Sequence, residues 1–263
     1  MPGKYVAALL IAIVFSASAY AGTLDAIKEK RKITIGVKYD FPPFGYLDEK
    51  GNLKGFDIQV ANYIAEKIGV VPEFRKATSQ ERINALLNVD VDIVIASMTK
   101  TPYRAKMIDF TNTYFVDGLG MLSAKASKIG SEKDLDNRII AVIMGSTGEK
   151  YFTSGTINFK ALALFREYTD AVDALKQGKV DVVVTDYAWC LAQQKTSNGA
   201  LIALKTALAA EPFGIGVRKN NKELLDKLNE ILADMWKDGS YKRAYSEYFG
   251  QDPDFNLMEL KER

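Results

Sequence analysis

The sequence has 263 residues, a formal net charge of +2, one cysteine and no histidine. A chain this close to neutral lacks the concentrated Lys and Arg that hold a phosphate backbone, which argues against nucleic acid as the principal partner. The missing histidine removes His-based acid–base catalysis and argues against a zinc or copper site. Cys190 has no partner for an intrachain disulfide, and its apolar surroundings predict a buried thiol.

Residues 1–21 have the pattern of a secretory signal peptide. Lys4 supplies the positive start, residues 6–15 form an unbroken apolar run, and Ala19-Tyr20-Ala21 matches the small–x–small cleavage pattern. The apolar run is shorter than the ~20 residues that a membrane-spanning helix needs. We therefore expect cleavage after Ala21 and export of the remaining chain.

The first half then alternates strands with helices. A β-branched run predicts a strand over Lys32–Val37, and Asp57 is expected to cap a helix that ends at Gly69. The pattern continues with an extended stretch over residues 71–75, a helix over 79–88, a strand over 91–96 and a helix capped by Thr101.

The second half follows a related order. Strands are expected over residues 139–143, 162–165 and 180–185, with helices after the first and over 170–177. Residues 110–124 have no helical period and read as an extended crossover between the halves. A final amphipathic helix, with apolar positions from Leu224 to Met235, is expected to pack back on the first half. This alternation predicts an α/β fold of two lobes, each a mainly parallel sheet flanked by helices, joined by two hinge crossovers.

A helix–strand unit occurs twice. Setting Val91-Asp92 against Val180-Asp181 gives an offset of 180 − 91 = 89, and the same offset pairs Ser97 with Asp186. Both residues follow an apolar strand, and ligands of open α/β sheets bind at the carboxyl ends of strands. The repeat therefore suggests two lobes that offer polar groups to one ligand, although two unrelated βα units would share this hydrophobic pattern.

Longer segments resemble the bacterial extracellular solute-binding proteins of family 3, the periplasmic amino-acid-binding components of ABC importers. The resemblance covers residues 24–250 and rests on the order of five segments: IGVKYDFPPFGYLDEKGNLKGFDIQVANYIAEKIG, TSQERINALLNVDVDIVIASMTKTPYRAKMIDFTNTY, GSTGEKYF, GKVDVVVTDYA and FGIGVRKNNKELLDKLNEILADMWKDGSYKRAYSEYFG. It implies a type II two-lobed fold with residues 22–113 and 212–263 in lobe 1 and residues 114–211 in lobe 2. It also implies a periplasmic monomer without a cofactor, which binds an amino acid and delivers it to a membrane permease.

The resemblance also implies which residues hold the amino-acid backbone. Arg104 corresponds to the residue that binds the α-carboxylate, and a strand end followed by a helix start suits that anion. Asp186 corresponds to the residue that binds the α-amino group. The other positions are Ser97, Met98 and Thr99 beside Arg104, the turn Gly145, Ser146 and Thr147 of the second half, and the aromatic Phe41. Several of these positions have a structural alternative. Thr101, Ser146 and Asp186 could simply cap helices, and Phe41 could belong to the core.

Three further residues are expected to select the ligand's side chain. Lys38 stands where binders of basic amino acids carry an acidic residue, and Ser79 and Arg82 lie in a TSQ-x-R-I stretch similar to that of glutamate/aspartate-binding members. Together with Arg104 these cations predict an acidic amino acid as ligand. Glutamine or another polar amino acid stays open if Asp40 or Glu81 neutralises Lys38 or Arg82. A dehydratase on the same scaffold is the alternative from another class.

Overall fold

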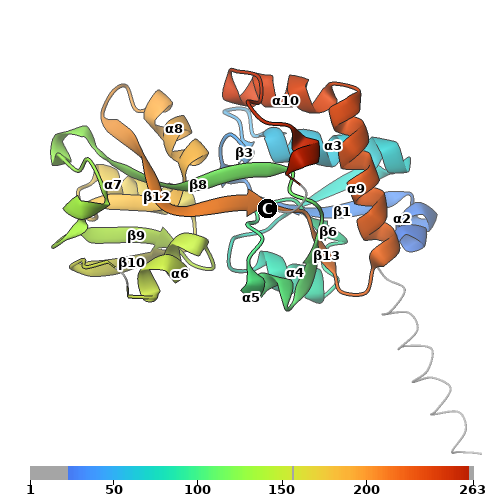
Figure 1. The fold of residues 1–263 in the computed structure, drawn as a ribbon, viewed down its shortest axis with the longest axis horizontal. Helices are drawn as coiled ribbons and strands as arrows, with labels where there is room; N and C mark the ends of the chain where they lie inside the picture. Colours follow the sequence, from blue (N-terminus) through green and yellow to red (C-terminus); the bar gives the residue numbers. More distant parts are fainter. Residues whose placement is uncertain (1–22, 156, 261–263) are drawn as a thin grey trace, which may run out of the picture.

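The computed structural model describes residues 23–155 and 157–260, which form two lobes (Figure 1). The expected signal peptide, residues 1–21, lies outside the described residues. Within the described ranges no helix is both long and apolar enough to cross a membrane.

Lobe 1 is built on a five-stranded sheet with the order β5-β1-β6-β13-β7. β1 pairs in parallel with β5 and β6, whereas β13 runs antiparallel to β6 and β7. The strands are β1 (Lys32–Val37), β5 (Val71–Lys76), β6 (Ile93–Val94), β7 (Ile108–Phe110) and β13 (Gly216–Arg218). A small antiparallel sheet beside them consists of β2 (Asp40–Phe41), β3 (Gly45–Leu47) and β4 (Leu53–Lys54).

Lobe 2 repeats this plan with the order β10-β9-β11-β8-β12. Its strands are β8 (Phe115–Ala124), β9 (Ile139–Ile143), β10 (Ala161–Phe165), β11 (Val182–Asp186) and β12 (Leu201–Phe213). β9 is parallel to β10 and β11, and β8 is antiparallel to β11 and β12. The two-lobed α/β class is confirmed, but both sheets are mixed rather than mainly parallel, because each also contains returning strands of antiparallel direction.

Helices cover both faces of each sheet. In lobe 1, α3 and α10 lie on one side of the sheet and α4 on the other (Figure 1). The expected C-terminal helix is α9, and its buried apolar face confirms that the tail packs on lobe 1. The helices are α2 (Leu24–Lys30), α3 (Phe56–Ile68), α4 (Arg82–Leu87), α5 (Pro102–Ala105), α6 (Thr147–Thr153), α7 (Tyr168–Lys176), α8 (Tyr187–Thr196), α9 (Lys222–Lys237) and α10 (Ser240–Phe249).

The repeat of the sequence is a repeat of structure. Ile93-Val94 of β6 and Val182-Val183 of β11 keep the offset, since 182 − 93 = 89. The repeated aspartates have the same function: Asp92 accepts the Thr34 N–H at 2.8 Å, and Asp181 accepts the Ile139 N–H at 2.7 Å. Each carboxylate thus anchors the neighbouring parallel strand near its start.

One expected cap is wrong. α3 begins at Phe56 after an N-cap at Gly55, whose φ of 130° suits a glycine. Asp57 lies inside the helix, and its buried carboxylate accepts the Ser97 N–H and the Tyr114 hydroxyl, each at 2.8 Å. A sequence pattern shows an acidic residue near a helix start, but it does not show that a distant loop offers that residue better donors.

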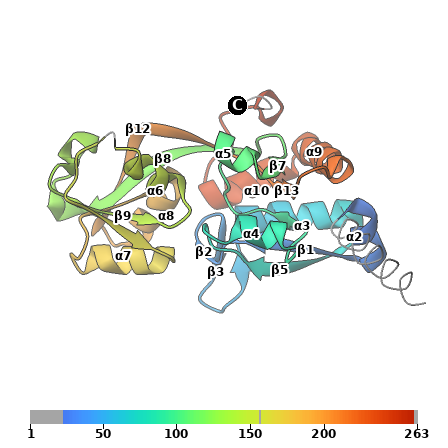
Figure 2. The same ribbon diagram turned by 90° about the horizontal axis from the view of Figure 1, so that it is seen from below.

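β8 and β12 are the two crossovers between the lobes (Figures 1 and 2). The end of β12 contacts lobe 1 through a bridge between Phe213 and Thr99 and through the Lys100 N–H, which donates to Pro212 O at 2.8 Å. The crossover near residues 110–124 is therefore confirmed as extended. The lobe boundaries at 113/114 and 211/212 stay predictions and lie beside the ends of these strands.

Candidate functional site between the lobes

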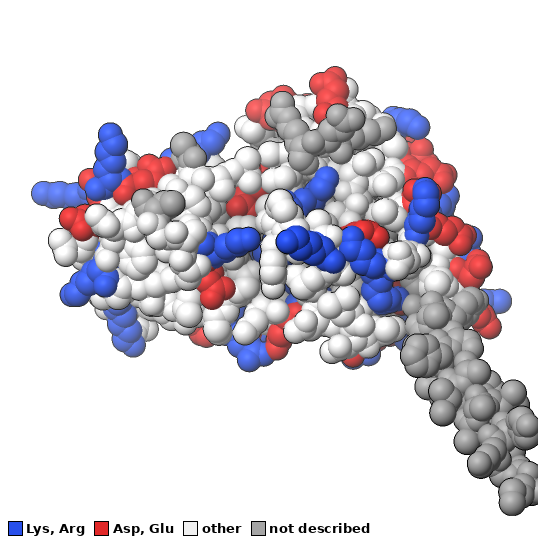
Figure 3. Space-filling model, turned by 60° about the horizontal axis from the view of Figure 1, so that its bottom comes forward, with Lys and Arg blue, Asp and Glu red and all other residues white. Residues whose placement is uncertain are grey.

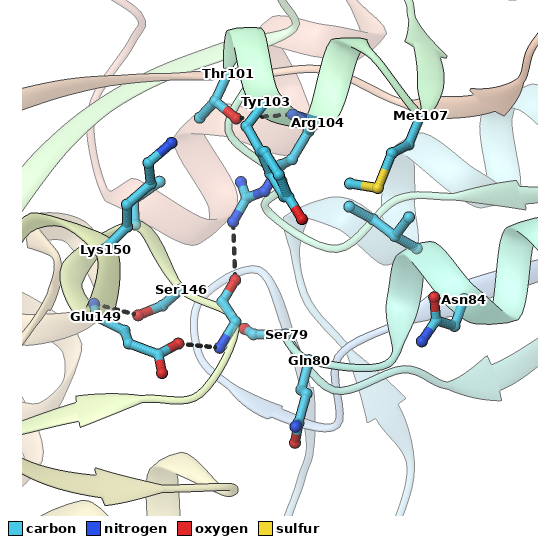
Figure 4. Close-up of a pocket in the computed structure, with 13 residues that line it drawn as sticks. Ser79, Gln80, Asn84, Thr101, Tyr103, Arg104, Met107, Ser146, Glu149 and Lys150 are labelled. Atoms are coloured by element: carbon cyan, nitrogen blue, oxygen red, sulfur yellow. Dashed lines mark hydrogen bonds between the residues drawn. The ribbon is translucent and has the colours of Figure 1, made fainter. Parts of the chain in front are cut away.

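Arg104 links the two lobes. Thr101 caps α5 by accepting the Arg104 N–H at 3.2 Å, with Pro102 at the first helical position, as expected. The Arg104 side chain is 6% exposed, and its Nη1 donates to Thr99 O at 2.8 Å. Its Nη2 donates across the interface to Gly145 O at 3.0 Å (Figure 4). Burial, and then the charge of Arg82, lower the pKa of Arg104 to about 9, so an anion at this position would be favoured.

The Gly145–Thr147 turn faces Arg104 from lobe 2. Ser146 caps α6 by accepting the Glu149 N–H at 3.1 Å, and Glu149 accepts the Gly145 N–H at 2.6 Å (Figure 4). Together with residues of lobe 1, this turn lines a cavity of about 350 Å³. Members of the lining from both lobes include Ser79, Gln80, Arg104, Gly145, Ser146 and Thr147. Arg104 and the Gly145–Thr147 turn, the groups predicted to bind the ligand's α-carboxylate, therefore lie together in the structure.

Gly145 sets how closely the lobes approach. A Cβ at this position would lie 2.6 Å from Gln80 Cα and 2.7 Å from Ser79 O, both backbone atoms of lobe 1. We expect Gly145→Ala to bind ligand at least about tenfold more weakly, because the added Cβ would clash with this backbone and destabilise the closed state. Small-angle X-ray scattering should then show a larger radius of gyration for the variant at saturating ligand. Gly178→Ala is the matched control, since its φ is also positive but its Cβ would meet nothing within 4 Å; equal effects of both changes would contradict the prediction.

Lys38 is buried in an aromatic environment, with 2% of its surface exposed. Its Nζ lies 3.6 Å from the centroid of the Phe41 ring and donates to the Tyr168 hydroxyl of lobe 2 at 3.1 Å. Phe41 in turn stacks on Trp189 of lobe 2, with ring centroids 5.9 Å apart. Burial, followed by the charge of Arg82, lowers the pKa of Lys38 to about 7. Lys38 and Phe41 therefore lie at the interface between the lobes, where Phe41 is fully buried in the apolar core, and their contact with a ligand stays a prediction.

Tyr168 is a site residue that sequence reasoning missed. Its hydroxyl lies 3.4 Å from Ser79 Oγ and also accepts from Lys38. The repeat contained a signal for it, since 168 − 79 = 89 makes Tyr168 and Ser79 equivalent positions in the two halves. The two halves thus face each other with matching residues.

Arg82 is buried, with 2% of its surface exposed, so it is not a solvated surface charge. Its Nη1 donates to Ala96 O at 2.6 Å and to Ser97 O at 3.4 Å, and its Nε has no partner among the described residues. Just before α4, the Thr78 hydroxyl accepts the Glu81 N–H at 3.2 Å and donates to the Glu81 carboxylate at 2.8 Å. The backbone contact that would complete a capping box is not among the hydrogen bonds of the described residues. Ser97 has a φ of 43°, which is unusual for a residue with a side chain, and its buried Oγ also lacks a partner in the described parts of the chain. Unused buried donors of this kind indicate a place for a polar ligand.

Asp186 ends β11 at the predicted strand end. It occupies the N-cap position of α8, but its side chain makes no capping hydrogen bond, so the plain capping alternative is not realised. Burial raises the pKa of Asp186, and the charges of Lys38 and Arg82 oppose that rise. A ligand ammonium would stabilise the ionised form in the same way.

Glu211 is a second missed residue. It is the one acidic residue of strand β12, whose other charged residue is Lys205, and its carboxylate accepts the Thr99 hydroxyl. Burial and the nearby Asp186 raise the pKa of Glu211 to about 7. The sequence signal was an acidic residue in an otherwise apolar run, which is costly to bury without a partner.

Met98 lies away from the other candidate residues. Its side chain is fully buried in the apolar cluster under α4, where a Cβ at Gly216 would meet Met98 Cε at 2.5 Å. Met98 contributes its carbonyl to lobe packing by accepting the Gly214 N–H at 3.0 Å. Cys190 is fully buried, as its apolar surroundings predicted.

Comparisons with known proteins agree with this architecture. The family model for bacterial extracellular solute-binding proteins, family 3, matches residues 33–251. The ABC transporter glutamine-binding protein GlnH of Bacillus subtilis is 35% identical over 88% of this chain and 86% of its own length. The glutamate-binding protein GluB of Corynebacterium efficiens is 28% identical over 88% of this chain and 83% of its own length.

A solved structure of an ancestral arginine-binding protein bound to glutamine superposes with a TM-score of 0.79 at 39% identity. The match covers 84% of this chain and 98% of that one. The family match and the two-lobed fold lead to one conclusion: this chain belongs to the bacterial extracellular solute-binding proteins, family 3.

Proposed function

We propose that the protein captures an acidic L-amino acid, glutamate or aspartate, between its two lobes in the periplasm and delivers it to an ABC transporter permease. The observation that carries the proposal is that three buried cations have no ion-pair partner among the described residues. Lys38, Arg82 and Arg104 form none of the ion pairs found among the described residues. Buried cations of this kind are stabilised by an anionic partner, and a dicarboxylic amino acid supplies two carboxylates.

The two carboxylates that the sequence offers as internal partners of Lys38 and Arg82 make other contacts. Asp40 accepts the Tyr168 N–H at 2.7 Å, and Glu81 forms an ion pair with Arg166 of lobe 2. A further pair, Lys76 with Glu167 at 3.0 Å, also joins the lobes. These contacts connect the lobes without using Lys38, Arg82 or Arg104, so the three remain available to a ligand.

In this proposal each group of the ligand has a partner. The α-carboxylate binds Arg104 and the Gly145–Thr147 turn, and the α-ammonium binds Asp186. The side-chain carboxylate binds Lys38 and Arg82, with Ser79 and Tyr168 as hydroxyl partners. Residues of both lobes are needed, so ligand binding favours the closed state.

Glutamine is the second candidate ligand, and Asp57 and Glu211 favour it. Both carboxyls are buried near the cations, and burial raises the pKa of Asp57 to about 6 and that of Glu211 to about 7. Once both are ionised, they balance two of the three positive charges, and a neutral amide side chain fits such a site. The glutamine-binding relative and the glutamine-bound ancestral structure are consistent with this alternative.

Isothermal titration calorimetry distinguishes the two ligands. L-Glutamate, L-aspartate, L-glutamine, L-asparagine, L-arginine, L-lysine and L-cystine would be titrated in turn at pH 7. We expect an acidic amino acid to bind at least about tenfold more tightly than its amide, which corresponds to about 1.4 kcal/mol. Chromatography of the released ligand should recover it unchanged. Tighter binding of L-glutamine than of both acids would refute the acidic assignment, and a chemically altered ligand would refute a pure binding role.

The surface agrees with a small-molecule ligand. Figure 3 shows Lys and Arg interspersed with Asp and Glu over both lobes on this face, without a broad patch of one sign. Binding of nucleic acid uses such a patch. The charges that matter for the proposed ligand are those buried between the lobes.

A further inference from the structure

We propose that Glu211 is a positioning residue for the ligand's ammonium group, because its carboxylate orients the Thr99 hydroxyl as a hydrogen-bond acceptor. The inference rests on the proposed function, since it takes an α-amino acid as the ligand. Glu211 is 1% exposed and belongs to the crossover strand β12 rather than to the motifs that the sequence singled out.

The crossover holds Glu211 beside both lobes. Glu211 pairs with Asp117 of β8, and the next two residues of β12 contact Lys100 and Thr99 of lobe 1. Its carboxylate accepts a hydrogen bond from the Thr99 hydroxyl of lobe 1, and the Thr147 side chain of lobe 2 acts to lower its pKa. One buried carboxylate of the crossover therefore fixes the direction in which the Thr99 hydroxyl donates.

The chemistry of the two groups assigns the direction of this contact. An ionised carboxylate can only accept, so the Thr99 hydroxyl gives its one hydrogen to Glu211. The lone pairs of the Thr99 hydroxyl oxygen stay free to accept from a ligand. An ammonium has three N–H donors, and the two oxygens of Asp186 with the Thr99 hydroxyl oxygen make three acceptors. A ligand carboxylate could not use the Thr99 hydroxyl, because its hydrogen is already engaged.

Several charged groups act on Glu211. Asp186 of β11 and Asp117 of β8 repel it, while Arg104 of α5 and Arg82 near the start of α4 attract it. Burial, and then Asp186, raise the pKa of Glu211 to about 7 and that of Asp117 to about 8. A protonated Glu211 has an O–H of its own, so it no longer forces the Thr99 hydroxyl to donate. An arriving ammonium favours the ionised carboxyl, so Glu211 releases protons on binding and its own contribution to affinity rises with pH.

The test compares Glu211→Gln with the wild type by calorimetric titration of L-glutamate at pH 6 and pH 8. We expect the variant to bind roughly tenfold more weakly at pH 8, as for loss of a hydrogen bond to a charged group. We also expect affinity to rise less, or fall more, between pH 6 and pH 8 than in the wild type, because the variant keeps the opposing proton uptake at Lys38. Titration in two buffers of different ionisation enthalpy should show fewer protons released per ligand. Glu230→Gln, an exposed change on α9, should behave as wild type.

Glu211→Asp keeps the charge and should retain the pH dependence even if its affinity falls. If L-glutamate fails to bind the wild type, the acidic-ligand assignment falls, and the same comparison is made with L-glutamine. Failure of the ligand assignment is thus separate from failure of the role given to Glu211.

A second measurement asks whether Glu211 acts on the ammonium. Glutarate lacks the amino group of L-glutamate, and glutaramate lacks that of L-glutamine. Glu211→Gln should reduce the preference for the amino acid over its deaminated analogue about tenfold, and it should have little further effect in a Thr99→Val background. An unchanged preference together with an unchanged pH dependence would overturn the proposal, even if thermal unfolding showed a loss of stability.

Discussion

Arg104→Ala should reduce ligand affinity by roughly 100-fold or more, in line with removal of one partner from a buried charge pair. The guanidinium is buried and contacts the carbonyls of Thr99 and Gly145, one in each lobe. Its loss removes the charge for the ligand's α-carboxylate and also a contact that holds the lobes together. Titration calorimetry with the amino acid that binds the wild type best measures the effect.

The size of the Arg104 effect should depend on geometry as well as charge. Arg104→Lys keeps a cation but loses the fork that pairs with a carboxylate through two parallel hydrogen bonds, so intermediate affinity is expected. Arg138→Ala is the matched control, because Arg138 pairs with Asp181 within lobe 2 at 3.4 Å. Wild-type affinity in Arg104→Ala would show that the α-carboxylate binds elsewhere.

Lys38→Met should change which ligand is preferred. Methionine keeps most of the apolar volume between Phe41 and Tyr168 and removes the charge. We expect the ratio of L-glutamate affinity to L-glutamine affinity to fall roughly 30-fold, the equivalent of about 2 kcal/mol. A ratio is the proper readout, because any general loss of stability or closure affects both ligands alike.

Proton uptake gives an independent signature of Lys38. Its pKa of about 7 reflects burial first and the charge of Arg82 second, and a ligand carboxylate beside it would raise that pKa again. Binding of L-glutamate should therefore take up a proton at Lys38 above pH 7, and its affinity should decline as pH rises further. Comparison with Lys38→Met separates the proton uptake at Lys38 from the proton release expected at Glu211.

Lys32→Met is a suitable control for Lys38→Met, since Lys32 pairs with Glu73 on the surface of lobe 1 at 2.7 Å. A ligand preference that stays the same in Lys38→Met would place the ligand side chain away from Lys38. The acidic-ligand proposal would then depend on Arg82 alone.

Local patterns accounted for most of the elements. β1 and β9 have the predicted bounds, because β-branched runs between turn residues favour strands regardless of context. The Thr101-Pro102 start of α5 was also correct, since a cap and a first-turn proline act within a few residues. Differences occurred where distant groups compete: β6 has two residues rather than six, and α7 begins at Tyr168, whose N–H is held by Asp40 of the other lobe.

In the candidate site, too, local patterns identified some residues, and contacts between distant groups decided the others. Arg104, Asp186, Lys38 and Arg82 could be named because each stands at a strand end or in a recognisable motif. The structure brings them to the interface between the lobes and buries them. Met98 was grouped with Ser97 and Thr99, although successive residues of an extended segment point to opposite sides. The packing under α4 shows that the Met98 side chain belongs to the core.

Local periodicity in the sequence was sufficient for the α/β alternation and the repeat, because both depend on residues close together in the chain. The two-lobed class followed from that alternation together with the family resemblance, and the residues for the amino-acid backbone stay predictions from that resemblance. The sequence could not assign Tyr168 or Glu211, nor the pKa values near 7 of Lys38 and Glu211. Those properties arise when β8 and β12 bring two lobes together and exclude water from polar groups far apart in the chain, such as Thr99 and Glu211, which are 112 positions apart. Burial and long-range pairing are properties of the folded interface, so only the tertiary structure could reveal them.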